Sequence, residues 1–246
     1  MDLYIGNINN FTIDELMPHV TDERAKVSLR FVHDDDKKRS LLAHALLNCA
    51  VCDRFPDITL PVNTVTDEQG KPHIYLPDGL KDPADERQEF HFSLSHSGEY
   101  AICAVDNDII GADIEYIDNK PVSYNKIATR FFCRQEADDI KDTETFFRIW
   151  TLKESFTKAV GLGLGLPLNS FRIIDLNSHD KFCHFVLMTG QSIPDKLTPF
   201  IKTGSDILTL NGISLLFESH YALSLATLSK DPDITFHRID DPVNLK

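Results

Sequence analysis

The chain has 246 residues, 42% of them hydrophobic, and its 38 acidic residues outnumber 25 basic ones to give a net charge of −13. This length can bury one large core or two modest ones. The acidic charge argues against nucleic acid as the main partner, and the lack of an apolar run long enough to span a bilayer argues against a membrane protein. Because the first ten residues do not resemble a secretion signal, we expect a cytoplasmic protein.

The first half of the chain is predicted to contain helices followed by strands. A strand near Leu3 to Ile8 precedes a capping box at Thr12 to Glu15, which indicates the start of a helix. A second start signal at Thr21 to Glu23 and a long helix over Lys37 to Cys52 follow. Further strands are predicted around Ile58, around Ile74, at Phe90 to Leu94, and in a hairpin formed by Tyr100 to Val105 and Ile109 to Ile117.

The second half repeats this order. Helices are predicted at Ser123 to Phe132, at Gln135 to Lys141, and from Thr143 to Val160 with Gly161 closing the last one. Strands are then predicted at Ser170 to Asp175, Phe182 to Met188, Ile207 to Leu210, Ile213 to Glu218 and Tyr221 to Leu228. Helices followed by strands, twice over, indicate an α+β fold with two similar halves.

The predicted strand IIGADIEYI carries two acids. Asp113 and Glu115 are two residues apart, so both side chains leave the same face of the strand, together with Gly111. The missing Cβ of Gly111 leaves room for a bulky ligand beside the carboxylates. Because Mg²⁺ prefers six oxygen ligands, two carboxylates predict a third acid and a phosphate nearby.

The predicted helix from Thr143 to Val160 offers that acid. Lys153 projects into the apolar face of the helix, where an ammonium must snorkel, pair with a carboxylate or meet an anion. Glu154 and Lys158 are four residues apart on a neighbouring face. An ordinary helical ion pair is the alternative interpretation of these two residues.

Together the two segments resemble the 4′-phosphopantetheinyl transferases of the surfactin-synthetase-activating type. Those enzymes carry a G-[IV]-D-x-E strand followed by a W-[ST]-x-K-E-[SA]-x-x-K helix. The matching positions are Gly111, Asp113, Glu115, Trp150, Lys153, Glu154, Ser155 and Lys158. Further similar segments are Arg39-Ser40-Leu41-Leu42, Gly70-Lys71-Pro72, Phe92 to Ser97, Ala128 to Phe132 and Leu166-Pro167-Leu168. The resemblance covers roughly residues 24 to 175.

The resemblance implies two α+β halves related by a pseudo-twofold axis, with coenzyme A bound in the cleft between them. We expect the boundary near residue 117, giving an N-terminal half of residues 1–117 and a C-terminal half of residues 118–246. The metal site would then form only when the two halves pack together.

The implied reaction transfers the 4′-phosphopantetheine arm of coenzyme A to a serine of an apo acyl or peptidyl carrier protein and releases adenosine 3′,5′-bisphosphate. Asp113, Glu115 and Glu154 would hold Mg²⁺ against the pyrophosphate. Lys158 would contact a phosphate directly, with Lys153 supporting it. The resemblance favours Glu154 as general base, and its base and ligand roles both stay open.

For the adenosine end of coenzyme A, the matching residues are Arg39, Ser40, Lys71, Ser95 and His96. The family usually has two basic residues before the helix that contains Arg39, and they reach the 3′-phosphate of coenzyme A. Arg24 matches the first position, whereas Val27 occupies the second.

Two other classes of function remain. A metal-dependent phosphoesterase or nuclease could use the same acids, although the acidic net charge counts against it. A carrier-binding or coenzyme A-binding protein without activity is the third possibility, which the complete set of carboxylates disfavours. Because two halves in one chain complete the cleft without a partner subunit, we expect a monomer.

Overall fold

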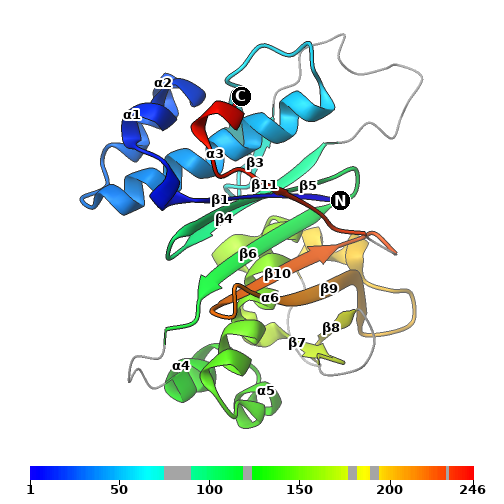
Figure 1. Cartoon of the computed structure of the whole chain (residues 1–246). Helices are drawn as coiled ribbons and strands as arrows, with labels where there is room; N and C mark the ends of the chain where they lie inside the picture. The colour runs from blue at the N-terminus through cyan, green and yellow to red at the C-terminus, as the bar shows by residue number, and fades with distance from the viewer. Residues whose placement is uncertain (75–89, 119–123, 177–181, 189–193, 231–232) are drawn as a thin grey trace. The chain divides into compact units, whose positions relative to one another are not determined.

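The computed structural model describes residues 1–74, 90–118, 124–176, 182–188, 194–230 and 233–246 (Figure 1). The chain divides into two compact units, Met1–Asp108 with Asp231–Lys246 and Ile109–Lys230. Each unit has its own hydrophobic core. Both units combine helices with a mainly antiparallel sheet, so the predicted α+β class is confirmed. Among the helices of the described residues, none combines the length and the apolar character that crossing a membrane requires.

The first unit is built on a four-stranded sheet in the order β11-β1-β5-β4, with a separate β2-β3 ribbon. The helix α3 lies across one face of this sheet (Figure 1). The elements of this unit are β1 (Asp2–Asn7), η1 (Ile8–Asn10), α1 (Ile13–Leu16), η2 (Met17–His19), α2 (Asp22–Ser28), α3 (Asp34–Arg54), β2 (Thr64–Thr66), β3 (Pro72–Ile74), β4 (His91–Ser97), β5 (Tyr100–Asp106), β11 (Thr235–Arg238) and η6 (Pro242–Asn244).

Two of the helix starts predicted in this unit, at Thr12 and at Thr21, are confirmed by side-chain caps. The Thr12 side chain accepts from the Glu15 backbone N–H, and the Glu15 carboxylate accepts from the Thr12 backbone N–H, so both halves of the capping box are present. Thr21 accepts from the backbone N–H of Arg24 at the start of α2. The long helix α3 begins with Asp34, Asp35 and Asp36, which interact favourably with the positive end of its dipole.

The second unit is built on a five-stranded antiparallel sheet in the order β6-β10-β9-β8-β7. The helix α6 packs against β6, β10 and β9. The elements of this unit are β6 (Ile110–Tyr116), α4 (Tyr124–Phe131), α5 (Arg134–Asp139), α6 (Thr143–Val160), η3 (Gly163–Gly165), η4 (Leu168–Ser170), β7 (Phe171–Ile174), β8 (Cys183–Leu187), η5 (Asp195–Phe200), β9 (Ile207–Phe217) and β10 (Tyr221–Thr227).

The ends of α6 follow the sequence signals. The Asp142 carboxylate accepts from the Thr145 backbone N–H at 2.7 Å and starts the helix. Gly161 ends it in the left-handed conformation with φ of 66°, as the sequence predicted. Both the first and the last residue of the helix were therefore readable from local sequence.

The predicted hairpin between residues 100–105 and 109–117 is wrong. β5 pairs with β1 and β4, whereas β6 pairs with β10. Six of the seven residues of β5 are buried, which makes it a central strand that needs a neighbour on each side. The turn after β5 therefore leads from the first unit to the second instead of closing a hairpin.

The division of the chain also differs from the expected boundary near residue 117. β6 belongs to the second unit, because it pairs along its whole length with β10 and packs against α6. The C-terminal segment returns to the first unit, where β11 pairs in parallel with β1. Asp113, Glu115 and Glu154 consequently lie in one unit, rather than being contributed by two.

Two strand predictions need correction. The predicted strands 207–210 and 213–218 form one continuous strand, β9, because Gly212 is a close-packing position and not a turn. A Cβ on Gly212 would lie 2.5 Å from Cys183 Sγ and 3.0 Å from a Leu152 methyl carbon. No strand forms around Ile58, whose segment lies between α3 and β2.

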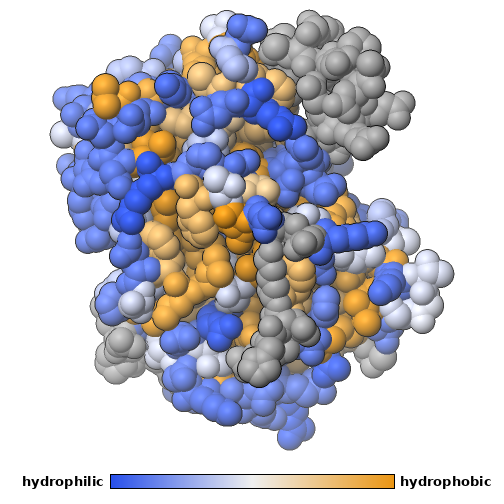
Figure 2. Space-filling model, turned by 45° about the vertical axis from the view of Figure 1, so that its right-hand side comes forward, coloured by the Kyte–Doolittle hydropathy of each residue, from blue (hydrophilic) through white to orange (hydrophobic). Residues whose placement is uncertain are grey.

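The surface mixes polar and apolar residues despite the acidic composition. Figure 2 shows hydrophobic residues, in orange, reaching the surface between hydrophilic ones. The exposed large hydrophobic side chains in the described segments are Val27, Leu29, Phe31, Val32, Val65, Tyr116, Phe131, Leu216, Phe236 and Val243.

Candidate active site

The close approach of α6 to β6 depends on Gly111. A Cβ at Gly111 would lie 2.0 Å from the Ser155 carbonyl oxygen and 2.5 Å from the Ala159 backbone nitrogen. The backbone of α6 therefore fills the space that the sequence assigned to a ligand, and that interpretation of Gly111 is corrected. What the glycine provides is contact between the strand and the helix that carry the predicted site residues.

Asp113 of β6 and Lys158 of α6 form an ion pair across this contact. The Lys158 ammonium donates to Asp113 Oδ1 at 2.7 Å and to the Ala112 carbonyl at 3.1 Å. The Asp113 side chain is 6% exposed and the Lys158 side chain 31%. A cation that remains accessible is therefore held beside a buried carboxylate, as a phosphate-contacting lysine would need to be.

Glu154 lies one helical turn before Lys158 and is partly buried. Burial raises the pKa of its carboxyl above the usual range, and the nearby Asp113 charge raises it further, while Lys158 lowers it. The Asp113 carboxylate on β6 is therefore close enough for its charge to act on the Glu154 carboxyl on α6. Glu115 is also partly buried and leaves β6 on the same face as Asp113.

The three predicted metal ligands do not form a ready-made metal site. Within the ranges that the structure describes, no group of three or more His, Cys, Asp or Glu side chains is arranged to hold a metal ion. The Lys158 ammonium lies beside Asp113 where a cation would bind. The donor chemistry nevertheless fits Mg²⁺, since Asp113 and Glu154 are carboxylates whose mutual repulsion a divalent cation would relieve.

A row of polar contacts fixes α6 on the sheet. Asp113, Ser224 and Ser214 lie opposite one another on the neighbouring strands β6, β10 and β9. The hydroxyls of Thr151 and Ser224 are 2.7 Å apart and buried, and Arg148 Nε donates to Ser214 Oγ at 3.2 Å. Because α6 is held at several points along this row, the positions of Glu154 and Lys158 are set by the whole sheet. The sequence pattern did not predict these contacts.

Lys153 has a structural environment. Its side chain is fully buried, and its ammonium pairs with Glu136 at 2.9 Å. It also donates to the Leu168 carbonyl at 2.8 Å and the Phe171 carbonyl at 2.7 Å, and lies 4.3 Å from the Phe171 ring centroid. These partners use the donors that a phosphate contact would need, so the structure differs from the prediction that Lys153 supports Lys158. Of the three outcomes open to a lysine in an apolar face, pairing with a carboxylate is the one observed.

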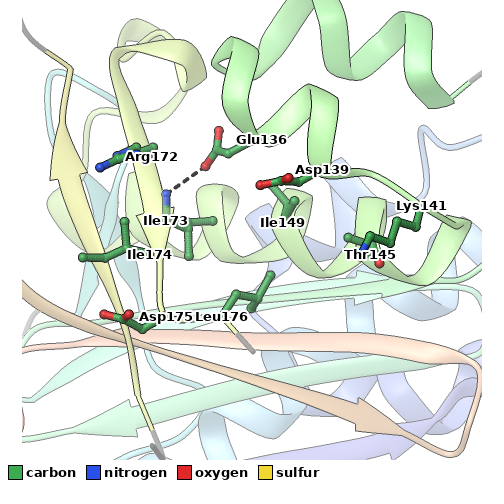
Figure 3. A pocket seen from close by; sticks show the side chains of 10 residues that line it. All are labelled: Glu136, Asp139, Lys141, Thr145, Ile149, Arg172, Ile173, Ile174, Asp175 and Leu176. Atoms are coloured by element: carbon green, nitrogen blue, oxygen red, sulfur yellow. Dashed lines mark hydrogen bonds between the residues drawn. The ribbon is translucent and has the colours of Figure 1, made fainter. Parts of the chain in front are cut away.

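Glu136 is the residue that the sequence interpretation missed. Its carboxylate accepts from the Ile173 backbone N–H at 2.8 Å (Figure 3). It also accepts from the Cys133 backbone N–H at 3.3 Å and pairs with Lys153. Ile173 and Phe171 lie on β7, the last strand of the sheet. The Ile173 N–H, which binds Glu136, and the Phe171 carbonyl, which binds Lys153, are directed away from β8. The Glu136–Lys153 pair therefore supplies an acceptor and a donor to an edge strand that, among the described residues, has no neighbouring strand on that side. Cys133 and Glu136 form a capping box at the start of α5. The sequence did not indicate it, because Cys133 stands where Ser, Thr, Asp or Asn is usual.

A pocket of about 530 Å³ opens beside Glu136. Figure 3 shows it between α5, the start of α6 and β7. None of the four predicted residues Asp113, Glu115, Glu154 and Lys158 lines it, so this pocket is not the predicted site.

In the first unit, two of the predicted adenosine-binding residues lie in one hydrogen-bond network. Arg24 donates to Ser40 Oγ at 2.5 Å, and the hydroxyls of Ser28 and Ser40 are 2.9 Å apart. In the described part of the chain, Arg24 Nε is buried with no hydrogen-bond partner. Val27, which occupies the second position where the family usually has a basic residue, is exposed and carries no charge.

The other predicted residues occupy different positions around α3. Arg39 donates to the Gly98 carbonyl in the β4–β5 turn and to Asp36 at 2.5 Å. His96 leaves β4 on the face that packs against α3, since it alternates with Leu94 of the core. Ser95 leaves β4 on the opposite face and is buried. Lys71 lies in the turn before β3, where its backbone N–H donates to Asp67 at 2.8 Å.

His44 is a second residue that the sequence interpretation missed. It lies one turn after Ser40 on α3, and its Nδ1 is 3.1 Å from the Ser40 carbonyl. Burial lowers the pKa of His44 to about 4, and the positive charges of Arg24 and His96 lower it further, against the hydrogen bond to Ser40. A histidine within an apolar helix gives no sequence signal of such an environment.

Comparison with known proteins supports the resemblance. A family model described as 4′-phosphopantetheinyl transferase, N-terminal, matches residues 11–108, and one described as the 4′-phosphopantetheinyl transferase superfamily matches residues 109–198. The 4′-phosphopantetheinyl transferase Sfp of Bacillus subtilis (strain 168) is 37% identical over 167 residues, which cover 65% of this chain and 68% of the relative. The 4′-phosphopantetheinyl transferase ffp of Bacillus subtilis is 37% identical over 198 residues, covering 77% and 79%. The 4′-phosphopantetheinyl transferase gsp of Aneurinibacillus migulanus is 30% identical over 177 residues, covering 68% and 67%.

The chain belongs to the 4′-phosphopantetheinyl transferase superfamily. It is a transferase that moves the 4′-phosphopantetheine arm of coenzyme A to a carrier protein. The two family models meet between residues 108 and 109, where the two structural units also meet. The phosphopantetheinyl transferase identity inferred from the two motifs is thereby confirmed.

Proposed function

We propose that this phosphopantetheinyl transferase uses the β6–α6 contact as its magnesium-dependent reaction centre. Asp113, Glu115 and Glu154 hold Mg²⁺, and Lys158 contacts a phosphate of coenzyme A. When bound, Mg²⁺ neutralises oxygens of the pyrophosphate and stabilises the leaving group. The observation that supports this proposal is the ion pair of 2.7 Å between Asp113 and Lys158, with Glu154 close enough for the Asp113 charge to raise its pKa.

Glu154 accepts the proton in this proposal. The serine hydroxyl of the carrier gives its proton to a Glu154 carboxylate oxygen, and the serine oxygen forms a bond to the β-phosphorus. The bond from that phosphorus to the bridging oxygen breaks, and adenosine 3′,5′-bisphosphate leaves. The position of Glu154, one helical turn before Lys158 on α6, supports this role.

Lys158 balances the charge that develops during the step. Its ammonium is bound to Asp113 in the absence of ligand and is about one-third exposed, so it is accessible to an anion. Transfer of negative charge to the pyrophosphate oxygens strengthens this contact in the transition state, which is the condition for catalysis.

For the other end of coenzyme A, we assign Arg24, Arg39, Ser40, Lys71, Ser95 and His96 as the adenosine-binding residues. Arg24 and Ser40 share a network with an unpartnered guanidinium nitrogen in the described structure, which supports an anionic ligand there. The acceptor is an acyl or peptidyl carrier protein, and the enzyme acts as a cytoplasmic monomer.

The test is a transfer assay with matched variants. The full chain is incubated with coenzyme A, Mg²⁺ and an apo carrier protein, and the mass of the carrier is followed. Glu154→Gln should reduce the rate by at least about 100-fold, since a general base contributes about 10² to 10⁴. Glu144→Gln is the control, because Glu144 is an exposed acid in the first turn of the same helix. A near-normal rate for Glu154→Gln, or transfer that persists when EDTA replaces Mg²⁺, would contradict the proposal.

A further inference from the structure

The first unit contains a partly buried histidine, His44, that the proposed reaction does not use and that contacts the Arg24–Ser40 network. His44, Ser40 and Arg24 are linked through one residue, since Ser40 offers its carbonyl to His44 and its hydroxyl to Arg24. A carbonyl oxygen can only accept, so His44 Nδ1 carries the hydrogen of this bond. In the neutral imidazole, Nε2 is then an acceptor without a hydrogen.

The charges that act on His44 come from two other elements. Arg24 of α2 and His96 of β4 are the groups on other elements that act on its titration. On its own helix, Arg39 lies more than one turn before it and is paired with Asp36. Burial, together with the smaller effect of the cationic neighbours, lowers the pKa of His44 to about 4, so the imidazole is neutral at pH 7.

We infer that His44 is a further residue of the phosphate-binding site and takes up a proton at Nε2 when a phosphate monoester of coenzyme A binds beside Arg24. The positive charges of Arg24 and His96 disfavour protonation of His44 in the free protein. A bound phosphate dianion adds two negative charges beside Arg24 and so favours protonation of His44. Nε2 becomes a donor on protonation, while Nδ1 keeps its bond to the Ser40 carbonyl. The inference rests on the proposed binding of coenzyme A by Arg24 and Ser40.

The sign of the pH dependence follows from the direction of the pKa change. Opposite charge within a few ångströms raises a pKa by about 1 to 3 units, which brings His44 from near 4 towards about 5 to 7. The contribution of His44 to affinity is therefore present below the pKa of the complex and is lost as the pH rises through it. For a bound pKa at the upper end of this range, affinity at pH 6 exceeds that at pH 8 by up to about tenfold.

The experiment is isothermal titration of the full chain with coenzyme A at pH 6.5, in buffers that differ in ionisation enthalpy. The dependence of the heat on the buffer gives the number of protons exchanged. His44→Asn keeps a donor for the Ser40 carbonyl but cannot be protonated. We expect wild type to take up a few tenths of a proton more than His44→Asn per coenzyme A. The comparison cancels the titration of the phosphate itself, whose second pKa is about 6.

Two further measurements make the outcome decisive. His184→Asn in β8 of the second unit is the control and should exchange protons as wild type does. With 3′-dephospho-coenzyme A, wild type and His44→Asn should exchange the same number of protons. In an NMR titration, the imidazole carbon shifts of His44 should show protonation with coenzyme A but not with the dephosphorylated ligand. Equal proton exchange by wild type and His44→Asn, or a difference that persists with the dephosphorylated ligand, overturns the inference. Failure of wild type to bind coenzyme A would instead overturn the proposed function, and the inference with it.

Discussion

Gly111→Ala tests the contact that positions the candidate active site. The new Cβ would lie 2.0 Å from the Ser155 carbonyl oxygen and 2.5 Å from the Ala159 nitrogen, whereas ordinary contact begins at 3.4 Å. Both atoms are helix backbone and cannot rotate away, so α6 must move from β6 by more than an ångström. Overpacking of this kind costs about 1 to 3 kcal/mol, and the backbone clash places this variant at the upper end.

The same movement should affect catalysis. Lys158 directly precedes Ala159 and holds Asp113 at 2.7 Å, and Glu154 directly precedes Ser155. A displacement of about 1 Å at a catalytic group can reduce the rate by about 100-fold. We therefore expect Gly111→Ala to lower the free energy of unfolding by about 3 kcal/mol and kcat by about 100-fold.

Urea unfolding followed by circular dichroism, and the carrier-mass assay at a temperature where the variant is folded, measure the two effects separately. Gly165→Ala is the matched control, since no atom lies within 4 Å of a Cβ built there. It should change stability by less than about 1 kcal/mol. If Gly111→Ala unfolds like wild type and transfers at a normal rate, the close packing of α6 on β6 does not set the site geometry.

Four other single variants test contacts within the two units. Lys153→Met and Glu136→Gln should each cost about 3 to 5 kcal/mol in urea unfolding, because each leaves a buried partner of the 2.9 Å pair uncompensated, and additive losses in the double variant would contradict the pairing. Thr151→Val removes the partner of the buried Ser224 hydroxyl and should cost about 1 to 3 kcal/mol, with thermal unfolding as the measurement and an unchanged melting temperature as the contrary result. The pKa of His44 falls from 6.5 to about 4 on folding, so the unfolded chain binds more protons in this window and the protein should lose about 3 kcal/mol of stability between pH 6.5 and 4. His44→Asn should reduce that loss, and identical pH–stability curves for the two proteins would refute this account.

Local sequence determined the elements that carry the chemistry. The ends of α6 follow from Asp142 and Gly161, whose side-chain cap and left-handed backbone need only residues of the same turn. The alternation in β6 places Asp113 and Glu115 on one face for the same reason, since strand geometry repeats every two residues. The motif order also gave the family, because it depends on the sequence of elements and not on their packing.

The tertiary structure decided which of these elements meet. Pairing of β6 with β10, instead of β5, moved all three acids into one unit, and the pattern of hydrophobic residues is the same for either partner. Lys153 could have met a phosphate or a carboxylate, and Glu136 with the β7 carbonyls decided the outcome. The electrostatic environment of His44 likewise depends on Arg24 and His96, which come from other elements. Local periodicity fixes where a side chain points, whereas its partners depend on long-range contacts that the folded chain alone establishes.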